Sequence, residues 1–155
     1  MNRWFALLLA VPILLTSQAY GQSDGYNKIL RNNFGQQVSL IQIIANPDLF
    51  EGKRVRFVAF FHLEFEDSGL YLHKEDSDQM LSENSVWIDL PSDIDQALVK
   101  KLNNHYVHCE GIFTSKDKGH MGAFAGTLSD VRWLDQSLSR DEINHMLHSE
   151  SKKSN

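Results

Sequence analysis

The sequence contains only one cysteine, Cys109, among its 155 residues. An intramolecular disulfide is therefore excluded, and with it the class of small secreted domains that depend on several disulfides. Basic residues are also in the minority, since 15 Lys and Arg stand against 20 Asp and Glu and form no stripe. An acidic surface repels phosphate backbones, so we expect no nucleic-acid partner.

The sequence also lacks a hydrophobic run long enough to cross a membrane. Residues 4–15 are mostly apolar, but about 12 residues fall short of the roughly 20 that a spanning helix needs, which disfavours an uncleaved anchor. Arg3 precedes this run, and polar and small residues follow it, which is the pattern of a secretory signal peptide. We predict a signal peptide over residues 1–21 with cleavage before Gln22, and cleavage after Ala19 is the alternative.

Cleavage would leave a soluble chain of about 130 residues, which is enough to bury a core without disulfides. No cysteine lies near the cleavage site, so we expect neither a lipid anchor nor stable membrane insertion. The expected location is the periplasm or outside the cell, and the lack of disulfides favours the periplasm. Composition predicts a flexible lead-in over 22–37, a single domain over 38–148 and a disordered tail over 149–155.

Alternation of apolar and polar residues predicts the strands. The clearest strand runs over 54–65, where every second residue is apolar, and its length requires a bend or pairing with two parts of the sheet. Asp67-Ser68-Gly69 is typical of a hairpin turn after it. The other strands are expected over 70–73, 85–90, 105–113 and 121–134, the last with a break or bulge near Gly126.

Capping residues predict the helices. Ser39 with Gln42, and Ser139 with Glu142, have the spacing of capping boxes at the start of a first and a last helix. Ser92 is the expected N-cap of a helix that ends before Asn103-Asn104, and residues 74–83 can hold a further short helix.

The order of elements is helix, β, β, β, helix, β, β, helix. This order predicts a mainly β fold, a β-barrel with accessory helices: a five-stranded OB-like Greek-key barrel with a helix between strands 3 and 4 and with N- and C-terminal helices. A small open α+β sheet is the alternative.

Several segments resemble a group of short exported bacterial proteins of unknown function. They are residues 40–47, 52–57, 70–72, 84–90 and 119–128, so the resemblance covers about residues 38–134. It implies export and an OB-like fold, and it implies no activity. Ala59 departs from the pattern, because a glycine is expected in the bend of the first strand.

No motif for catalysis, a metal or a cofactor stands out. The seven histidines lack metal-motif spacing, and His105 and His108 point to opposite faces of a strand because their spacing is odd. Cys109 lies within a strand among apolar residues, where a thiol is usually inert. We therefore expect no catalytic residue, no metal ligand and no cofactor.

The most specific functional prediction concerns the outer face of strands two and three. If Leu70, Val86 and their alternate neighbours face the core, then the residues between them face outward and offer aromatic rings beside polar groups. This predicted ligand face consists of Tyr71, His73, Trp87 and Asp89. The alternative is that Tyr71 and Trp87 are covered and form a second small core.

These observations favour a non-enzymatic periplasmic binding or adaptor module, whose partner is another envelope protein, a peptide or a glycan. A small envelope hydrolase that uses Glu64, Glu66 or His62 is the alternative. Nucleic-acid or oligosaccharide binding, which OB folds commonly perform, is the third possibility, and the acidic charge opposes its nucleic-acid form.

Overall fold

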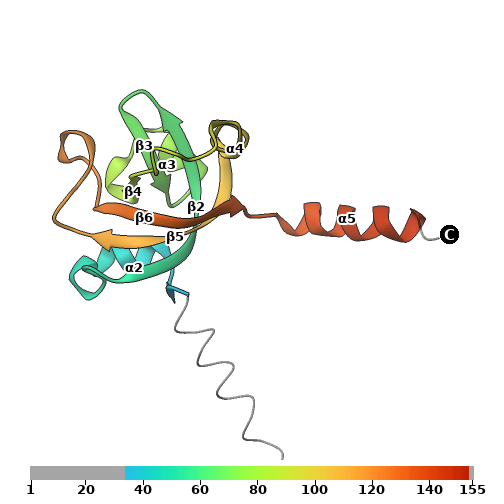
Figure 1. Ribbon diagram of the computed structural model, residues 1–155, viewed down its shortest axis with the longest axis horizontal. Coiled ribbons are helices and arrows are strands. Elements are labelled where there is room, and N and C mark those ends of the chain that lie inside the picture. The colour runs from blue at the N-terminus through green and yellow to red at the C-terminus, as the bar shows by residue number, and fades with distance from the viewer. Residues whose placement is uncertain (1–33, 154–155) are drawn as a thin grey trace, which may run out of the picture. The chain divides into compact units, whose positions relative to one another are not determined.

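The computed structural model describes residues 34–153 (Figure 1). The predicted signal peptide, and the predicted lead-in as far as residue 33, lie outside the described residues. Within the described residues the chain is mainly β, with six strands in one mixed sheet and four α-helices. The prediction of a mainly β fold is confirmed.

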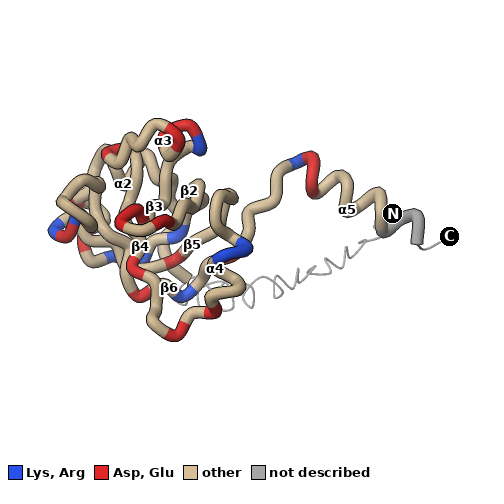
Figure 2. Tube along the Cα trace, turned by 90° about the horizontal axis from the view of Figure 1, so that it is seen from above, with Lys and Arg blue, Asp and Glu red and all other residues tan. Residues whose placement is uncertain are grey.

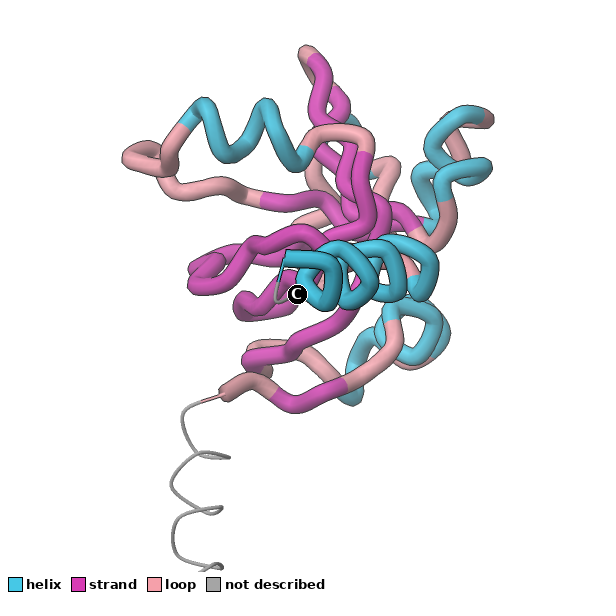
Figure 3. The backbone as a smooth tube through the Cα atoms, turned by 90° about the vertical axis from the view of Figure 1, so that its right-hand side faces the viewer, coloured by secondary structure: helices cyan, strands magenta, loops and turns pink. Residues whose placement is uncertain are grey.

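Figure 3 distinguishes the strands from the helices by colour. The strands are β1 (Gln36–Gln37), β2 (Arg54–Glu64), β3 (Asp67–Tyr71), β4 (Ser85–Ile88), β5 (His105–Thr114) and β6 (Thr127–Gln136). The helices are α2 (Leu40–Ala45), α3 (Lys74–Asp78), α4 (Gln96–Leu102) and α5 (Arg140–Lys153), with 3-10 turns at Pro47–Leu49, Ser82–Asn84 and His120–Gly122.

Hydrogen bonding runs around five of the strands as a ring. The sheet order is β1-β2-β3-β4-β6-β5, and β2 also pairs with β5. The pairings in the ring are antiparallel except that between β4 and β6, which is parallel. The length of β2 makes the ring possible, because its Phe60–Glu64 half pairs with β3 while Arg54–Phe61 pairs with β5 on the other edge.

The main core gathers apolar side chains from β2, β3, β4, β5 and β6 and from helices α2 and α4. On β2 the predicted alternation is present, with Val55, Phe57, Ala59 and Phe61 fully buried. Helix α2 starts at the predicted capping box, in which the Ser39 N–H donates to Gln42 Oε1 at 2.9 Å. The box fixes the start of the helix, so Leu40 and Ile43 enter the core.

Several predicted boundaries differ from those in the structure. The hairpin turn lies at Phe65–Glu66 rather than at 67–69, and Glu66 adopts a φ of 68° there. The fifth strand starts at Thr127 rather than at 121, because positive φ angles at 119, 121 and 122 build a turn that no strand can contain. Helix α4 is capped by Asp95 rather than Ser92, since the Asp95 carboxylate accepts from Ala97 N at 2.8 Å.

Both ends of the described chain carry regular structure. Strand β1 forms inside the expected lead-in and pairs with β2, and α5 continues to Lys153, where the sequence predicted a disordered tail from residue 149. The predicted capping box at the start of α5 is present, with Ser139 N donating to Glu142 Oε2 at 2.7 Å. None of the described helices combines the length and the apolar character that a membrane span requires.

Charged residues are spread over the described elements. Figure 2 shows Lys and Arg positions scattered among Asp and Glu positions, with no continuous basic stripe in the part of the chain that it colours.

Candidate functional site

Tyr71, the first residue of the predicted ligand face, is fully buried, with an exposed fraction of 0 %. It packs with Phe60 and Phe124 in a second, smaller cluster, against which Trp87 lies half-buried. The prediction that Tyr71 is available to a ligand is therefore wrong, and the alternative, in which Tyr71 and Trp87 are part of a second small core, is confirmed. The phenol donates a hydrogen bond to Asp67 Oδ1 at 2.8 Å, and burial together with this carboxylate raises the pKa of Tyr71.

His73 is exposed but does not join the other predicted residues. The chain leaves β3 at Tyr71, and His73 becomes the N-cap of α3, where its N–H donates to Asp76 Oδ2 at 2.9 Å. Its place is set by the start of this short helix, so the expected strand alternation does not apply to it.

Trp87 and Asp89 do lie together. The Trp87 ring makes a T-shaped contact with Phe124, with centroids 5.2 Å apart, and the backbone of Gly119 presses against it so closely that a Cβ there would lie 2.6 Å from Trp87 Cγ. Asp89 follows β4 and is exposed, while its N–H is held by the carbonyl of Leu128 at 2.9 Å.

Both residues line a pocket of about 370 Å³ beside β3 and β4, which we name the Trp87 pocket. Its polar side chains are Ser68, Asp89, Ser92 and Gln96. Its remaining lining residues are Leu63, Trp87, Ile88, Leu90, Pro91, Ile94 and Val99. An indole ring beside a carboxylate, hydroxyls and an amide can stack on one face of a ligand and hydrogen-bond its edge.

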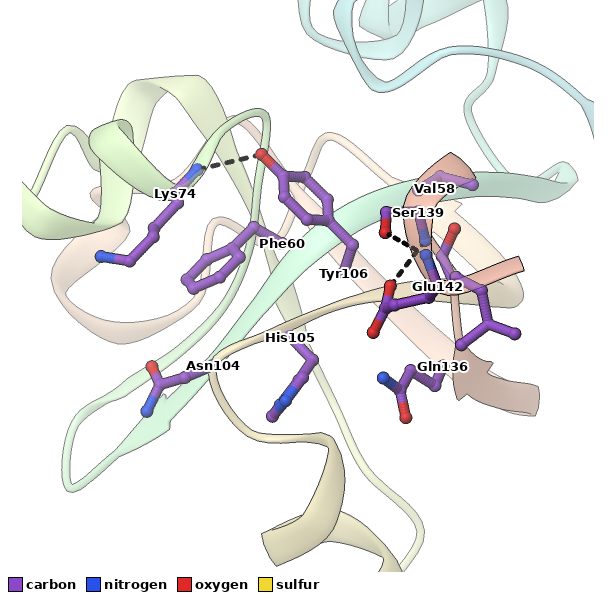
Figure 4. Close-up of a pocket in the computed structure, with 11 residues that line it drawn as sticks. Val58, Phe60, Lys74, Asn104, His105, Tyr106, Gln136, Ser139 and Glu142 are labelled. Carbon is purple, nitrogen blue, oxygen red and sulfur yellow. Dashed lines mark hydrogen bonds between the residues drawn. The ribbon is translucent and has the colours of Figure 1, made fainter. Parts of the chain in front are cut away.

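A second pocket, of about 340 Å³, lies on the outer side of β2 and β5 near the start of α5 (Figure 4). We name it the Tyr106 pocket; it is lined by Val58, Phe60, Lys74, Asn104, His105, Tyr106, Gln136, Ser137, Leu138, Ser139 and Glu142. The sequence did not predict it. The useful signal was the presence of Phe60 and Tyr106 on the expected polar faces of their strands, but only the β2–β5 register places them opposite each other.

The residues of the hydrolase alternative are only partly brought together. His62 Nε2 lies 3.6 Å from Glu64 Oε1 and 3.8 Å from Asp67 Oδ2, and His62 Nδ1 is 2.7 Å from Asn104 Oδ1. Glu66 turns away and pairs instead with His120 at 3.7 Å. These contacts tie the β2–β3 hairpin to neighbouring loops.

None of the hydrolase residues lines the Trp87 or the Tyr106 pocket. The contacts of His62, Glu64 and Glu66 are accounted for by their role in holding the β2–β3 hairpin. The hydrolase alternative stays a prediction.

Metal and thiol chemistry find no support in the described residues. Among them, no group of three or more His, Cys, Asp or Glu side chains is placed to hold a metal ion. Cys109 is fully buried, its thiol lies 3.5 Å from the carbonyl oxygen of Phe57, and burial raises the pKa of the Cys109 thiol. A buried, protonated thiol is a poor nucleophile.

Comparisons with known proteins found no match to this chain. It matches no protein-family model, no curated protein and no solved structure.

Proposed function

We propose that this chain is an exported, non-enzymatic binding module with an OB-like barrel, and that its Trp87 pocket binds a glycan. The ring of strands supports the barrel: α4 lies between the third and fourth strands of the ring, and the third and fifth of these strands pair in parallel. OB barrels bind oligosaccharides and other ligands on the outer face of their second and third strands. In this chain β3 and β4 hold those places.

The observation that carries the glycan assignment is the composition of the Trp87 pocket. Trp87 and the other apolar lining residues give the pocket an apolar surface, and Asp89 gives it a charged acceptor. Ser68, Ser92 and Gln96 add short polar groups of both donor and acceptor type. A sugar ring needs such a combination, because one of its faces is apolar while its edge carries hydroxyls.

The same composition argues against a nucleic acid. No Lys or Arg is among the residues that line the Trp87 pocket, and Asp89 adds a negative charge. A phosphate backbone would be repelled there rather than neutralised.

The test is to titrate the full chain with a panel of bacterial cell-wall oligosaccharides and to measure the affinities by calorimetry. We expect Asp89→Asn to weaken binding about tenfold, the effect of losing a charge-assisted hydrogen bond. Asp89 is exposed, so the melting temperature should stay unchanged. Asp93→Asn is the matched control, since Asp93 is exposed nearby but does not line this pocket.

Two results would contradict the glycan proposal. One is the absence of binding across the panel, and the other is an equal loss of affinity in the Asp89 and Asp93 variants. Export is tested separately by fractionating cells that carry a C-terminally tagged copy. Export predicts a tagged protein in the periplasm or medium whose mass lacks residues 1–21.

A further inference from the structure

The Tyr106 pocket has an apolar wall on one side. Phe60 and Tyr106 meet edge to face with ring centroids 5.5 Å apart, and Tyr106 keeps 39 % of its surface exposed. Val58 and Leu138, each 39 % exposed, continue this wall. The wall can therefore cover the flexible hydrocarbon stem of a ligand, and the tyrosine ring can meet a cation.

The pocket is also lined by polar and charged side chains. Figure 4 shows Glu142, Gln136 and His105 around the same cavity. Glu142 Oε2 accepts from Ser139 N at 2.7 Å, and the carboxylate lies among the residues that line the pocket. His105 Nδ1 lies 2.9 Å from the carbonyl of Asn103, which can only accept, so Nδ1 is the donor in this contact.

Glu142 is the one carboxylate among the residues that line the pocket, and Lys74 and His105 are the basic side chains there. The hydrogen bonds from Ser139 lower the pKa of Glu142, which keeps its carboxylate ionised at neutral pH. Lys74 does not cancel this charge, because its Nζ is bound to both carboxylate oxygens of Asp78 at 2.6 Å. The α5 N-terminus does not attract an anion strongly, since the Glu142 N–H is already bonded to Ser139 Oγ.

We infer that the Tyr106 pocket is a second binding site, which receives an arginine or lysine side chain of a polypeptide partner. The stem of that side chain lies along Val58 and Leu138, and its cationic head meets Tyr106 and Glu142. The site is separate from the Trp87 pocket and shares none of its lining residues.

A polypeptide fits this site better than a free polyamine does. The surface continues past the pocket onto α5, where Ile143, Met146 and Leu147 are exposed. These side chains offer further apolar contacts that a small amine cannot use but that the residues next to a basic side chain can. The excess of acidic residues in the chain also favours the approach of a basic partner.

The experiment is calorimetric titration of the full chain with the capped tripeptides Leu-Arg-Leu, Leu-Lys-Leu and Leu-citrulline-Leu. Citrulline keeps the shape of arginine without its charge, so we expect at least about tenfold weaker binding. Glu142→Gln removes the charge but preserves the capping box, in which Gln serves as well as Glu, and it should weaken the Arg peptide about tenfold.

Matched variants separate this effect from a loss of structure. Asp141→Asn removes a neighbouring exposed charge that does not line the pocket, and it should leave binding within about twofold. Tyr106→Phe keeps the ring and should bind normally, whereas Tyr106→Leu should bind about fivefold more weakly. Circular dichroism checks that each variant remains folded.

Several outcomes would overturn the inference. They are equal affinity for the arginine and citrulline peptides, equal effects of the Glu142 and Asp141 variants, and spermidine binding as tightly as the Arg peptide. Glycan binding at the Trp87 pocket should be unchanged in Glu142→Gln, so this site and the proposed glycan site can fail independently.

Discussion

Strand β2 buries residues on both of its faces, and the two faces differ in what they bury. Phe57 and Phe61 point into a core that collects apolar side chains from the five strands of the ring. Phe60 points the other way, into a cluster whose other buried members are Tyr71 and Phe124. The outer cluster has polar edges and adjoins both pockets, because Phe60 lines one and Trp87 the other. The inner core joins the five strands of the ring, and the outer cluster borders the two pockets.

The sharpest test of this comparison replaces neighbouring phenylalanines on opposite faces of β2. Phe61→Ala should lower the free energy of unfolding by about 3–5 kcal/mol, the range for a phenylalanine in a closely packed core. Phe60→Ala should cost about 2–3 kcal/mol, because the cluster is small and Phe60 borders the Tyr106 pocket, so water can enter the space that the ring leaves. Urea denaturation measures both. Equal losses would show that the outer cluster is packed as tightly as the inner core.

A second test concerns the turn that covers the outer cluster. Gly119 has a φ of 62° and a ψ of −155°, and a Cβ there would lie 2.6 Å from Trp87 Cβ and Cγ. Gly119→Ala should therefore cost about 2–4 kcal/mol from backbone strain and overlap together.

Gly52→Ala is the control for this turn. Gly52 also has a positive φ, 67°, but its Cβ would have no atom within 4 Å, so only about 1–2 kcal/mol of strain is expected. Thermal unfolding and Trp fluorescence measure the two variants. If Gly119→Ala is as stable as Gly52→Ala, the turn can shift to make room for the new Cβ and does not fix the position of Trp87.

The smallest expected loss of stability comes from removing the hydrogen bond at the polar edge of the outer cluster. Tyr71→Phe removes the hydrogen bond to Asp67 and should cost about 1 kcal/mol at pH 7. The pKa of Tyr71 is raised in the folded state, so its contribution is complete below the ordinary tyrosine pKa of about 10 and is lost as the pH rises above it. The native chain should therefore lose stability above about pH 10 more steeply than the variant does. Parallel slopes would contradict this role of the phenol.

Much of the fold could be predicted from the sequence because local chemistry dictates it. The alternation along residues 54–65 identified the inner face of β2, and the capping boxes at Ser39 and Ser139 marked the starts of α2 and α5. Alternation says which residues share a face, but not what covers that face. Tyr71 was placed in solvent for this reason, since Phe124, which helps to cover it, comes from a loop distant in the sequence.

The candidate sites divide in the same way. Trp87 and Asp89 lie two residues apart on one extended segment, so the sequence could place them together. His73 does not lie with them, because β3 ends at Tyr71 and His73 is already the N-cap of α3. The Tyr106 pocket could not be predicted, because it requires the pairing of Phe60 with Tyr106 and the approach of Glu142 from the other end of the domain.

The pairing of β2 with β5 also sets the order in which the chain can fold. Arg54 finds its partner in Ile112, so one edge of β2 has no mate until synthesis has passed that residue. Contacts this distant in sequence close slowly, and in the interval an open strand edge is a template for pairing with another nascent chain. The pairing of β2 with β5 protects this edge of β2 in the finished ring. Because it forms late, the same pairing leaves the unfinished chain prone to aggregate.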